Sequence, residues 1–270
     1  MRWRDTASYW DDLGKRNPFG VILTGSDRLP GTWDLDAFFH TGLEDVTRVM
    51  SELEAIAPNG SRRAALDFGC GVGRISRALS AHFDHVVGVD VAFSMIAAAR
   101  RLNRGYTRCV FRVNRAARLR GLKSNSFDFV YSRLVLQHIP PPSVRRYLQE
   151  LVRVVAPGGI LMFQLPEPLE QDPDRLYKDE KQLFVNGPIV ETTLKRFVPH
   201  ALIRGYRHLR FRRLVRRRAP SHRMYTFGVP RDEVLDLLDR AGAIVIRIDA
   251  DQSHGDHVPG HVYWVTKRKV

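Results

Sequence analysis

Three glycines at alternate positions, flanked by two aspartates, form the residue set in this sequence best suited to binding a nucleotide-like ligand. They are Gly69, Gly71 and Gly73, with Asp67 just before them and Asp90 further along the chain. Glycine tolerates positive φ and lets a ligand approach the backbone closely. A carboxylate about 20 residues after such a turn is suited to a ribose diol. The set therefore predicts a site for a ligand that contains a nucleoside.

The spacing of these glycines argues against a dinucleotide. In a dinucleotide fingerprint the third glycine follows the second by three residues. Here that position is Arg74, and the third glycine is Gly73. Asp67 is placed to meet an ammonium group. A ligand with a ribose, an ammonium and a carboxylate, but no phosphate, fits the set, so we expect S-adenosyl-L-methionine as the cofactor.

The local sequence predicts the elements that position this set. The apolar run 64–68 indicates a buried strand, and the residues from Arg74 to about Phe83, with apolar side chains at 75, 78 and 79, indicate the helix that follows the turn. The run 86–89 predicts a second strand that ends at Asp90. Strand, turn and helix form the first half of a βαβ unit, so we expect the glycines and Asp90 at one edge of a parallel sheet. Further along, Ser143 is expected to cap a helix that runs to Val155, and the run 160–165 predicts a fifth strand.

Four pieces of sequence extend the pattern. They are LDFGCGVGR at 66–74, VVGVD at 86–90, NSFDFVYSRLVLQHI at 125–139 and LVRVVAPGGILMF at 151–163. In these pieces, which lie in family order, the chain resembles the class I S-adenosylmethionine-dependent methyltransferases, and a weaker match covers 231–270. The resemblance implies an α/β fold with a doubly wound, mostly parallel sheet of seven strands. The implied strand order is 3-2-1-4-5-7-6, with an antiparallel last strand.

The resemblance also implies which residues bind the cofactor. Asp67 and the glycine turn would hold its methionine part, Asp90 its ribose, and Met95 (or Phe93) would flank the adenine. The full expected set is Asp67, Gly69, Cys70, Gly71, Gly73, Asp90, Val91, Met95, Asn114, Arg115 and Arg133.

One position departs from the family pattern. After the third strand the family usually has an acidic residue that receives the adenine amino group, whereas this chain has Asn114 and Arg115. Asn114 has a carbonyl that can accept from the amine, but an arginine side chain is donor-only. We therefore expect Asn114 to face the adenine edge.

Methyl transfer requires alignment of acceptor, methyl and sulfur, and a base only where the acceptor holds a proton. His138 follows the fourth expected strand, 127–132, and is the candidate base, since histidine titrates near neutrality. The alternative is that it packs over the cofactor or hydrogen-bonds a loop carbonyl. The chain lacks an (Asp/Asn)-Pro-Pro-aromatic motif after that strand, which argues against N-methylation of adenine or cytosine. Cys70 has no neighbouring base in sequence, so we do not expect a nucleophile there.

The other histidines carry weaker predictions. His200, His208 and His222 lie in an expected insertion and could reach an acceptor. The remaining group, His254, His257 and His261, has metal-like spacing, but we expect surface histidines there and no metal site.

Charge is the clearest feature of the composition. The chain has 270 residues, 43 Lys or Arg against 29 Asp or Glu, and a net charge of +14. Residues 192–231 hold 12 basic and no acidic residues, and the rest of the chain has nearly equal numbers of basic and acidic residues. This segment, arginine-rich over 195–223, would bind an acidic acceptor, contact nucleic acid or an anionic membrane, or form a solvated face.

Size and hydropathy predict a cytoplasmic protein. The hydrophobic fraction is 44%, which suffices for a packed core. No apolar run reaches the ~18 residues of a transmembrane helix, and the N-terminal residues lack the apolar middle of a signal peptide. Two cysteines are too few for a disulfide framework.

The expected organisation has four parts. Residues 1–40 form an N-terminal arm or cap without a helix-length apolar period, 41–165 the S-adenosylmethionine-binding core, 166–224 the basic insertion for acceptor recognition, and 225–270 the end of the core sheet. The expected function is in-line transfer of a methyl group to an O or N nucleophile of a small molecule, including an acidic one. RNA methylation through the basic insertion, or a non-catalytic S-adenosylmethionine-binding module, are the alternatives.

Overall fold

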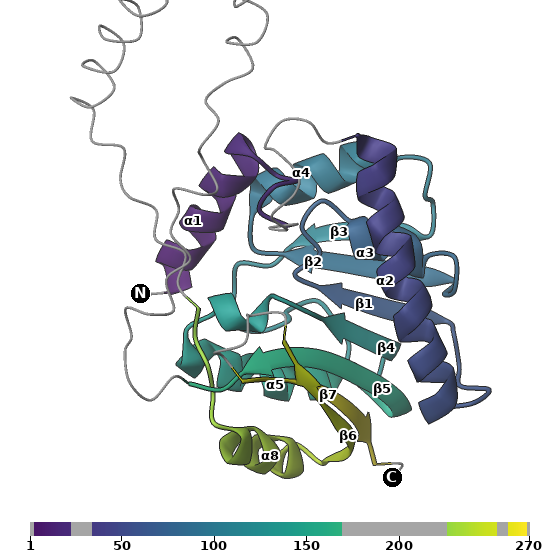
Figure 1. Ribbon diagram of the computed structural model, residues 1–270, viewed down its shortest axis with the longest axis vertical. Helices are drawn as coiled ribbons and strands as arrows, with labels where there is room; N and C mark the ends of the chain where they lie inside the picture. The colour runs from purple at the N-terminus through teal and green to yellow at the C-terminus, as the bar shows by residue number, and fades with distance from the viewer. Residues whose placement is uncertain (1–2, 23–33, 169–225, 253–258, 269–270) are drawn as a thin grey trace, which may run out of the picture.

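The structure, a computed structural model, describes residues 3–22, 34–168, 226–252 and 259–268. Seven strands form one sheet in the order β3-β2-β1-β4-β5-β7-β6, which confirms the expected order and fold class (Figure 1). β7 is antiparallel to both of its neighbours. The strands are β1 (Ala64–Phe68), β2 (His85–Asp90), β3 (Cys109–Val113), β4 (Phe127–Ser132), β5 (Val155–Pro166), β6 (Ala243–Asp251) and β7 (Gly260–Lys267).

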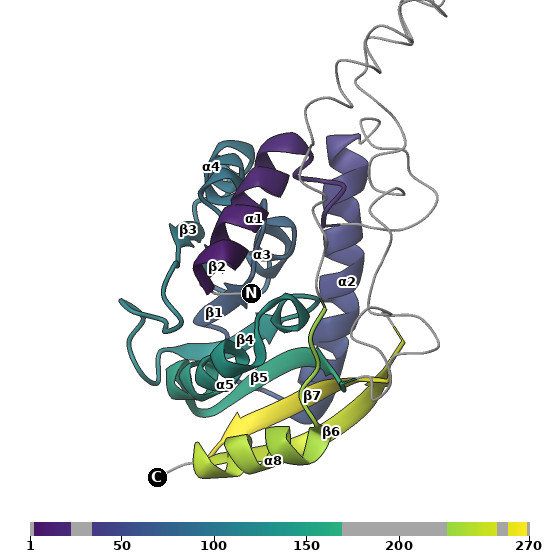
Figure 2. The same ribbon diagram turned by 90° about the vertical axis from the view of Figure 1, so that its left-hand side faces the viewer.

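Helices cover both faces of the sheet. The helices of the described ranges are α1 (Trp3–Arg16), α2 (Leu35–Ile56), α3 (Arg74–Leu79), α4 (Phe93–Leu102), the 3-10 helix η1 (Leu136–His138), α5 (Pro141–Val154) and α8 (Arg231–Arg240). α2 lies on one side of the sheet and α5 on the other (Figure 2). Side chains alternate accordingly along β1, where Ala65 packs in the core beneath α2 and α3 and Leu66 in the core beneath α5 and α8.

The described part of the N-terminal arm differs from its expectation. It contains α1, contrary to the expectation of no helical period, because Ala7, Trp10 and Leu13 share one face and Ala7 and Leu13 are buried. The Asp11 carboxylate also accepts a hydrogen bond of 2.7 Å from the N–H of Ser94, and the Asp11 carbonyl accepts one of 2.8 Å from the Ser94 hydroxyl. α2 begins at Leu35, with the Asp34 carboxylate accepting from the N–H of Asp36. The core therefore begins before residue 41.

Three expected boundaries shift in the structure. α3 ends at Leu79, whereas the sequence predicted a helix to about Phe83. α5 begins at Pro141 and not after a Ser143 cap, since proline is preorganised for a first helical position. β5 begins at Val155, five residues before the expected Ile160, because Val155 pairs with Phe127 across an irregularity in the ladder.

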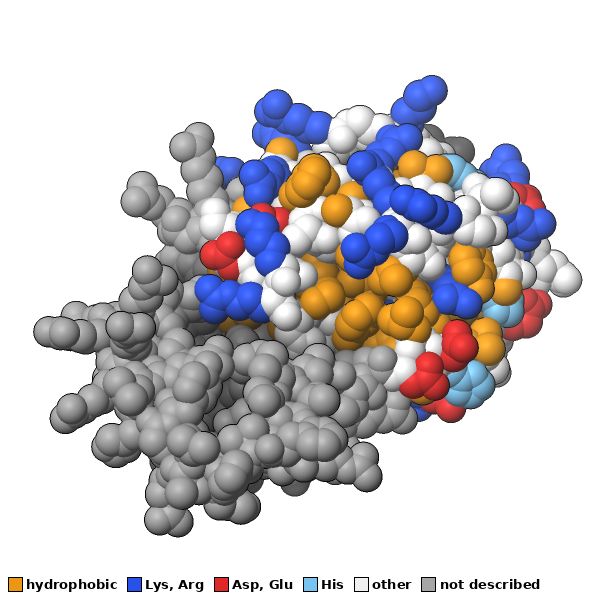
Figure 3. Space-filling model, turned by 90° about the horizontal axis from the view of Figure 1, so that it is seen from above, with side chains coloured by type: hydrophobic (Ala, Val, Ile, Leu, Met, Phe, Trp, Pro, Cys, Tyr) orange, Lys and Arg blue, Asp and Glu red, His pale blue; other side chains and the backbone are white. Residues whose placement is uncertain are grey.

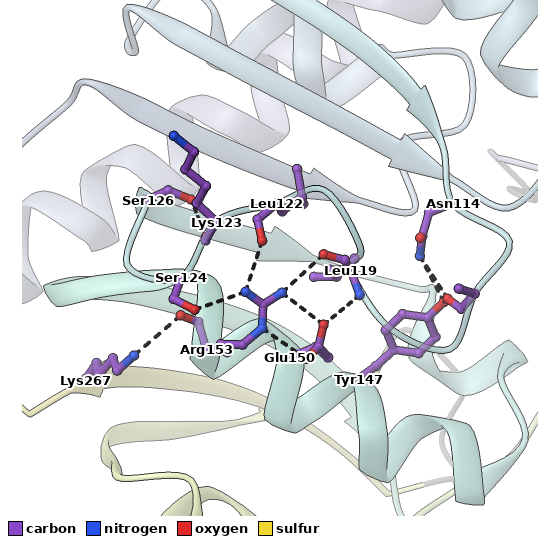
Figure 4. Close-up of polar contacts among 11 residues, drawn as sticks. Asn114, Leu119, Leu122, Lys123, Ser124, Ser126, Tyr147, Glu150, Arg153 and Lys267 are labelled. Carbon is purple, nitrogen blue, oxygen red and sulfur yellow. Dashed lines mark hydrogen bonds and ion pairs between the residues drawn. The ribbon is translucent and has the colours of Figure 1, made fainter.

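A side-chain network fixes the loop 114–126, which joins β3 to β4 without a helix (Figure 4). Arg153 of α5 donates to the carbonyls of Leu119 and Leu122 and to the Glu150 carboxylate, at 3.0–3.1 Å. Glu150 in turn accepts from the N–H of Leu119 at 2.7 Å. These bonds satisfy backbone groups that a helix would otherwise pair.

We expect Arg153→Ala to lower the free energy of unfolding by about 2–4 kcal/mol, because it removes the donor to the Leu119 and Leu122 carbonyls and to the Glu150 carboxylate. Urea unfolding followed by circular dichroism measures this. Arg240→Ala is the matched control, since Arg240 is 75% exposed and pairs with an exposed Asp236, so a change within about 0.5 kcal/mol is expected. Equal effects in the two variants would contradict the structural role of Arg153.

Candidate cofactor site

The glycine turn joins β1 to α3 at the carboxyl edge of the sheet. Gly69, Gly71 and Gly73 all have positive φ, at 82°, 52° and 86°. A Cβ on Gly69 would lie 2.2 Å from the Val135 side chain, and one on Gly71 would lie 2.8 Å from Ile22. The turn therefore requires glycine at these positions for its conformation and for close packing.

Asp90 ends β2 beside this turn. One of its carboxylate oxygens accepts from the N–H of Gly71 at 3.0 Å, and the other accepts from the N–H of Ala92 at 2.8 Å. Burial raises the pKa of Asp90, against the opposing effect of these hydrogen bonds. A carboxylate in this position stabilises the turn and keeps lone pairs for a hydroxyl donor.

Asp67 lies beneath the turn and is 2% exposed. It accepts a hydrogen bond of 2.6 Å from the Ser76 hydroxyl of α3. Its pKa is raised to about 6, chiefly by burial and to a smaller extent by the nearby Asp90, against the lowering effects of Ser76 and Arg74. Two buried carboxylates thus give the turn a negative potential, which favours a cationic ligand.

We expect Asp67→Asn to stabilise the protein increasingly as pH rises. The folded-state pKa of about 6 exceeds the ordinary value, so the ionised carboxylate destabilises the fold fully above pH 6, and this penalty disappears as pH falls below about 4. The stability difference between variant and wild type should grow by about 2–3 kcal/mol from pH 4 to pH 8. Thermal unfolding across that range measures it, and a pH-independent difference would contradict the raised pKa.

Neighbouring residues of the expected set have distinct environments. Met95 is 3% exposed and packs near Gly14 of α1, whereas Phe93 is 60% exposed. Val91 is half-buried at the start of the β2–α4 connection. Cys70 is buried, and burial raises the pKa of its thiol well above the ordinary value, which agrees with a thiol that is not a nucleophile.

Asn114 and Arg115 follow β3 at the same edge. The Asn114 amide donates to the carbonyl of Ala116 and to the hydroxyl of Tyr147, both at 3.1 Å (Figure 4). Arg115 is exposed. The sequence did not single out Tyr147, because its helical spacing marked it only as a core residue.

α1 crosses the carboxyl edge of the sheet (Figures 1 and 2). Its Trp10 ring lies 5.0 Å from the ring of His138, which follows β4, while Asp11 contacts Ser94 on α4. The Nε2 of His138 lies 3.1 Å from the amide nitrogen of Gln137. α1 therefore joins the two sides of the edge at which a ligand of this fold lies.

Several expectations fall outside the described residues. They include His200, His208, His222, His254, His257 and the arginine-rich segment. His261 is described, and its Nε2 lies 2.5 Å from a Glu167 oxygen. The described residues contain no group of three or more potential metal ligands. None of the helices in these ranges is long and apolar enough to cross a membrane.

The strand order and the match of residues 66–163 are those of a class I S-adenosylmethionine-dependent methyltransferase domain with a Rossmann-like fold. Residues 66–163 match a family model described as a methyltransferase domain. The cofactor of this class is S-adenosylmethionine, and the carboxylates beside the turn fit a cationic nucleoside of this kind.

Known relatives agree with this class. A trans-aconitate 2-methyltransferase of Methylobacterium radiotolerans is 33% identical over 54% of each chain. A malonyl-[acyl-carrier protein] O-methyltransferase of Methylovorus is 32% identical over 51% of this chain and 47% of its own. The chain thus spans about half the length of these curated relatives. The fold is also that of the magnesium protoporphyrin IX methyltransferase from Synechocystis with bound SAH, at a TM-score of 0.57, 14% identity and coverage of 97% and 99%.

Proposed function

We propose that this protein transfers the methyl group of S-adenosylmethionine to an oxygen or nitrogen of a small acidic molecule. The observation that carries the cofactor part is the pair of buried carboxylates, Asp67 and Asp90, against the glycine turn. Asp90 would bind the ribose hydroxyls, and the turn would hold the methionine part. Met95 would flank the adenine, and Asn114 would face its edge.

The sulfonium of the cofactor is already electrophilic, so the protein's task is alignment and exclusion of water. α1 would enclose the reacting groups, since Trp10 and Asp11 connect it to both sides of the sheet edge. The acidic acceptor is supported by the relatives named for trans-aconitate and malonyl-carrier substrates. Arg133, at the end of β4, supplies a cation on the acceptor side.

The experiment that tests this proposal has two readouts. Calorimetry should show micromolar binding of S-adenosylmethionine, and transfer of a radiolabelled methyl group to a cell extract, sorted by product size, should label small acidic products. Absence of cofactor binding would overturn the proposal. Binding without any transfer would favour the non-catalytic module instead.

We expect His138→Gln to lower kcat less than about 5-fold with a carboxylate acceptor, because a carboxylate has already lost its proton at neutral pH and needs no base. His138 would then act by packing against Trp10. A loss of ~100-fold or more, with the acid limb of the pH profile removed, would instead assign His138 as the base for a hydroxyl acceptor. Steady-state kinetics between pH 5 and 9 separate the two outcomes.

A second candidate, methylation of RNA, is favoured by one observation. Between Asp90 and Asp128 the chain holds nine Lys or Arg residues and no Asp or Glu, and all nine are exposed. They lie at the end of α4, in the connection to the edge strand β3, on β3 itself and on the loop 114–126. Although the chain outside residues 192–231 has nearly equal numbers of basic and acidic residues, the charged residues of this region are all basic. Figure 3 shows Lys and Arg side chains over much of the described surface near α4, with acidic ones at its margins. The residues are Arg100, Arg101, Arg104, Arg108, Arg112, Arg115, Arg118, Arg120 and Lys123.

Two results would support this second candidate. RNA affinity should fall steeply with salt, and the triple variant Arg104→Glu, Arg112→Glu and Arg120→Glu should abolish it. Absent or salt-independent binding removes it.

A further inference from the structure

The side chain of Arg133 extends from the end of β4 to a buried carboxylate. Its Nη2 lies 3.6 Å from Oδ1 of Asp251, at the end of β6. The Asp251 side chain is 5% exposed and that of Arg133 33% exposed. The guanidinium is therefore anchored at one side and open to solvent at another.

Within the described part of the chain, the Nε of Arg133 is buried and has no hydrogen-bond partner. A guanidinium has five N–H donors, and a contact of 3.6 Å is longer than the ~2.7–2.9 Å of a direct charge-assisted hydrogen bond. Leaving a buried cationic donor without an acceptor costs free energy, so such groups in native proteins point to a ligand or a functional role.

The backbone beside Arg133 is held in an uncommon conformation. Leu134 has a φ of +58°, and its N–H donates to the fully buried Gln164 side chain of β5 at 3.0 Å. Positive φ is unfavourable for leucine, so it persists only where surrounding contacts enforce it. The next residue, Val135, packs against Gly69 of the cofactor turn. Arg133 is thus fixed beside the cofactor site.

The strand order gives the direction of the side chain. The cofactor strands β1 and β2 lie on one side of β4, whereas β5, β7 and β6 lie on the other. Because Asp251 belongs to β6, the Arg133 guanidinium extends away from the cofactor strands. This direction favours an anion of the acceptor over the carboxylate of the cofactor.

We propose that Arg133 binds a carboxylate of the methyl acceptor, with Asp251 as its positioning residue. The planar fork of arginine matches a carboxylate through two parallel N–H···O bonds, which the point charge of lysine does not reproduce. The buried Asp251 carboxylate holds the guanidinium in place and the acceptor carboxylate completes its hydrogen bonds. This inference rests on the proposed function and specifies its substrate class as carboxylic acids.

The test compares Arg133→Gln, Arg133→Lys and Asp251→Asn with the wild type and with Arg240→Gln, a variant of an exposed arginine on α8. The probes are trans-aconitate, malonate and a dimethyl ester of trans-aconitate, which keeps one carboxylate as the methyl acceptor, with radiolabelled S-adenosylmethionine as donor. We expect Arg133→Gln to raise KM for the acids roughly 10- to 100-fold with a smaller change in kcat. Arg133→Lys should rescue only part of this loss, Asp251→Asn should show an intermediate KM, and Arg240→Gln should match the wild type.

Cofactor affinity, measured by calorimetry in every variant, distinguishes failure of the proposed function from failure of the role proposed for Arg133. A wild type that does not bind S-adenosylmethionine overturns the proposed function itself. A wild type that binds the cofactor but methylates the dimethyl ester as efficiently as the acids overturns only the assignment of Arg133. A wild type that binds the cofactor but methylates none of the acids overturns the carboxylic-acid substrate class. A rise in the cofactor Kd of Arg133→Gln, with the acceptor KM unchanged, would also overturn it and return Arg133 to the cofactor.

Discussion

Asp90→Ala is expected to weaken binding of S-adenosylmethionine by ~100-fold or more while the fold remains intact. The change removes acceptors for the ribose hydroxyls and, in the same step, the bonds to the N–H groups of Gly71 and Ala92 that hold the turn. Each hydrogen bond to a charged group contributes about 1.5–3 kcal/mol, so the loss of two accounts for this factor. Calorimetry measures the affinity, and circular dichroism checks the fold.

Two variants make this result specific. Asp84→Ala removes an exposed carboxylate just before the same strand and should leave the affinity unchanged. Asp90→Asn keeps one acceptor oxygen and should fall between wild type and alanine. Micromolar affinity in Asp90→Ala would show that the ribose binds elsewhere.

Gly69→Ala is expected to lower the free energy of unfolding by about 2–5 kcal/mol and to abolish cofactor binding. Its φ of +82° strains any residue with a Cβ, and that Cβ would lie 2.2 Å from Val135. Relief of this clash must move either the turn or the segment after β4, and both line the site.

Two other glycines separate the effect of backbone strain from the effect of the clash with Val135. Gly121 has a φ of +82° with open space around it, so Gly121→Ala should cost only the backbone strain, about 1–2 kcal/mol. Gly105 has neither a positive φ nor a neighbour within 4 Å, so Gly105→Ala should change stability by less than about 1 kcal/mol. Urea unfolding with a constant m-value measures the stability of all three variants. Equal losses of unfolding free energy in Gly69→Ala and Gly121→Ala would show that the Val135 side chain moves aside at no cost.

The strands and the turn were predictable because they depend on short-range patterns. An apolar run before alternating glycines gives a strand and a turn in any context, and the observed bounds of β1 and β2 match the runs that end at Phe68 and Asp90. The resemblance supplied the strand order, which the structure confirms. α1 was missed because its contacts to Ser94 and His138 are polar or aromatic and cross 83 residues or more of sequence.

By itself, then, the sequence determined the fold class, the cofactor turn and the carboxylates beside it. Only the tertiary structure showed that the buried Asp67 accepts a hydrogen bond from Ser76 and that Asp251 pairs with Arg133. It also showed that the arginines around β3 lie together at one edge of the sheet. The physical reason is the distance along the sequence over which each property is decided. Backbone conformation follows from neighbouring residues, whereas burial and the pairing of charges depend on which distant segments pack together. The turn predicts the place of the cofactor from local sequence, whereas the proposed acceptor site combines residues of strands more than 100 residues apart.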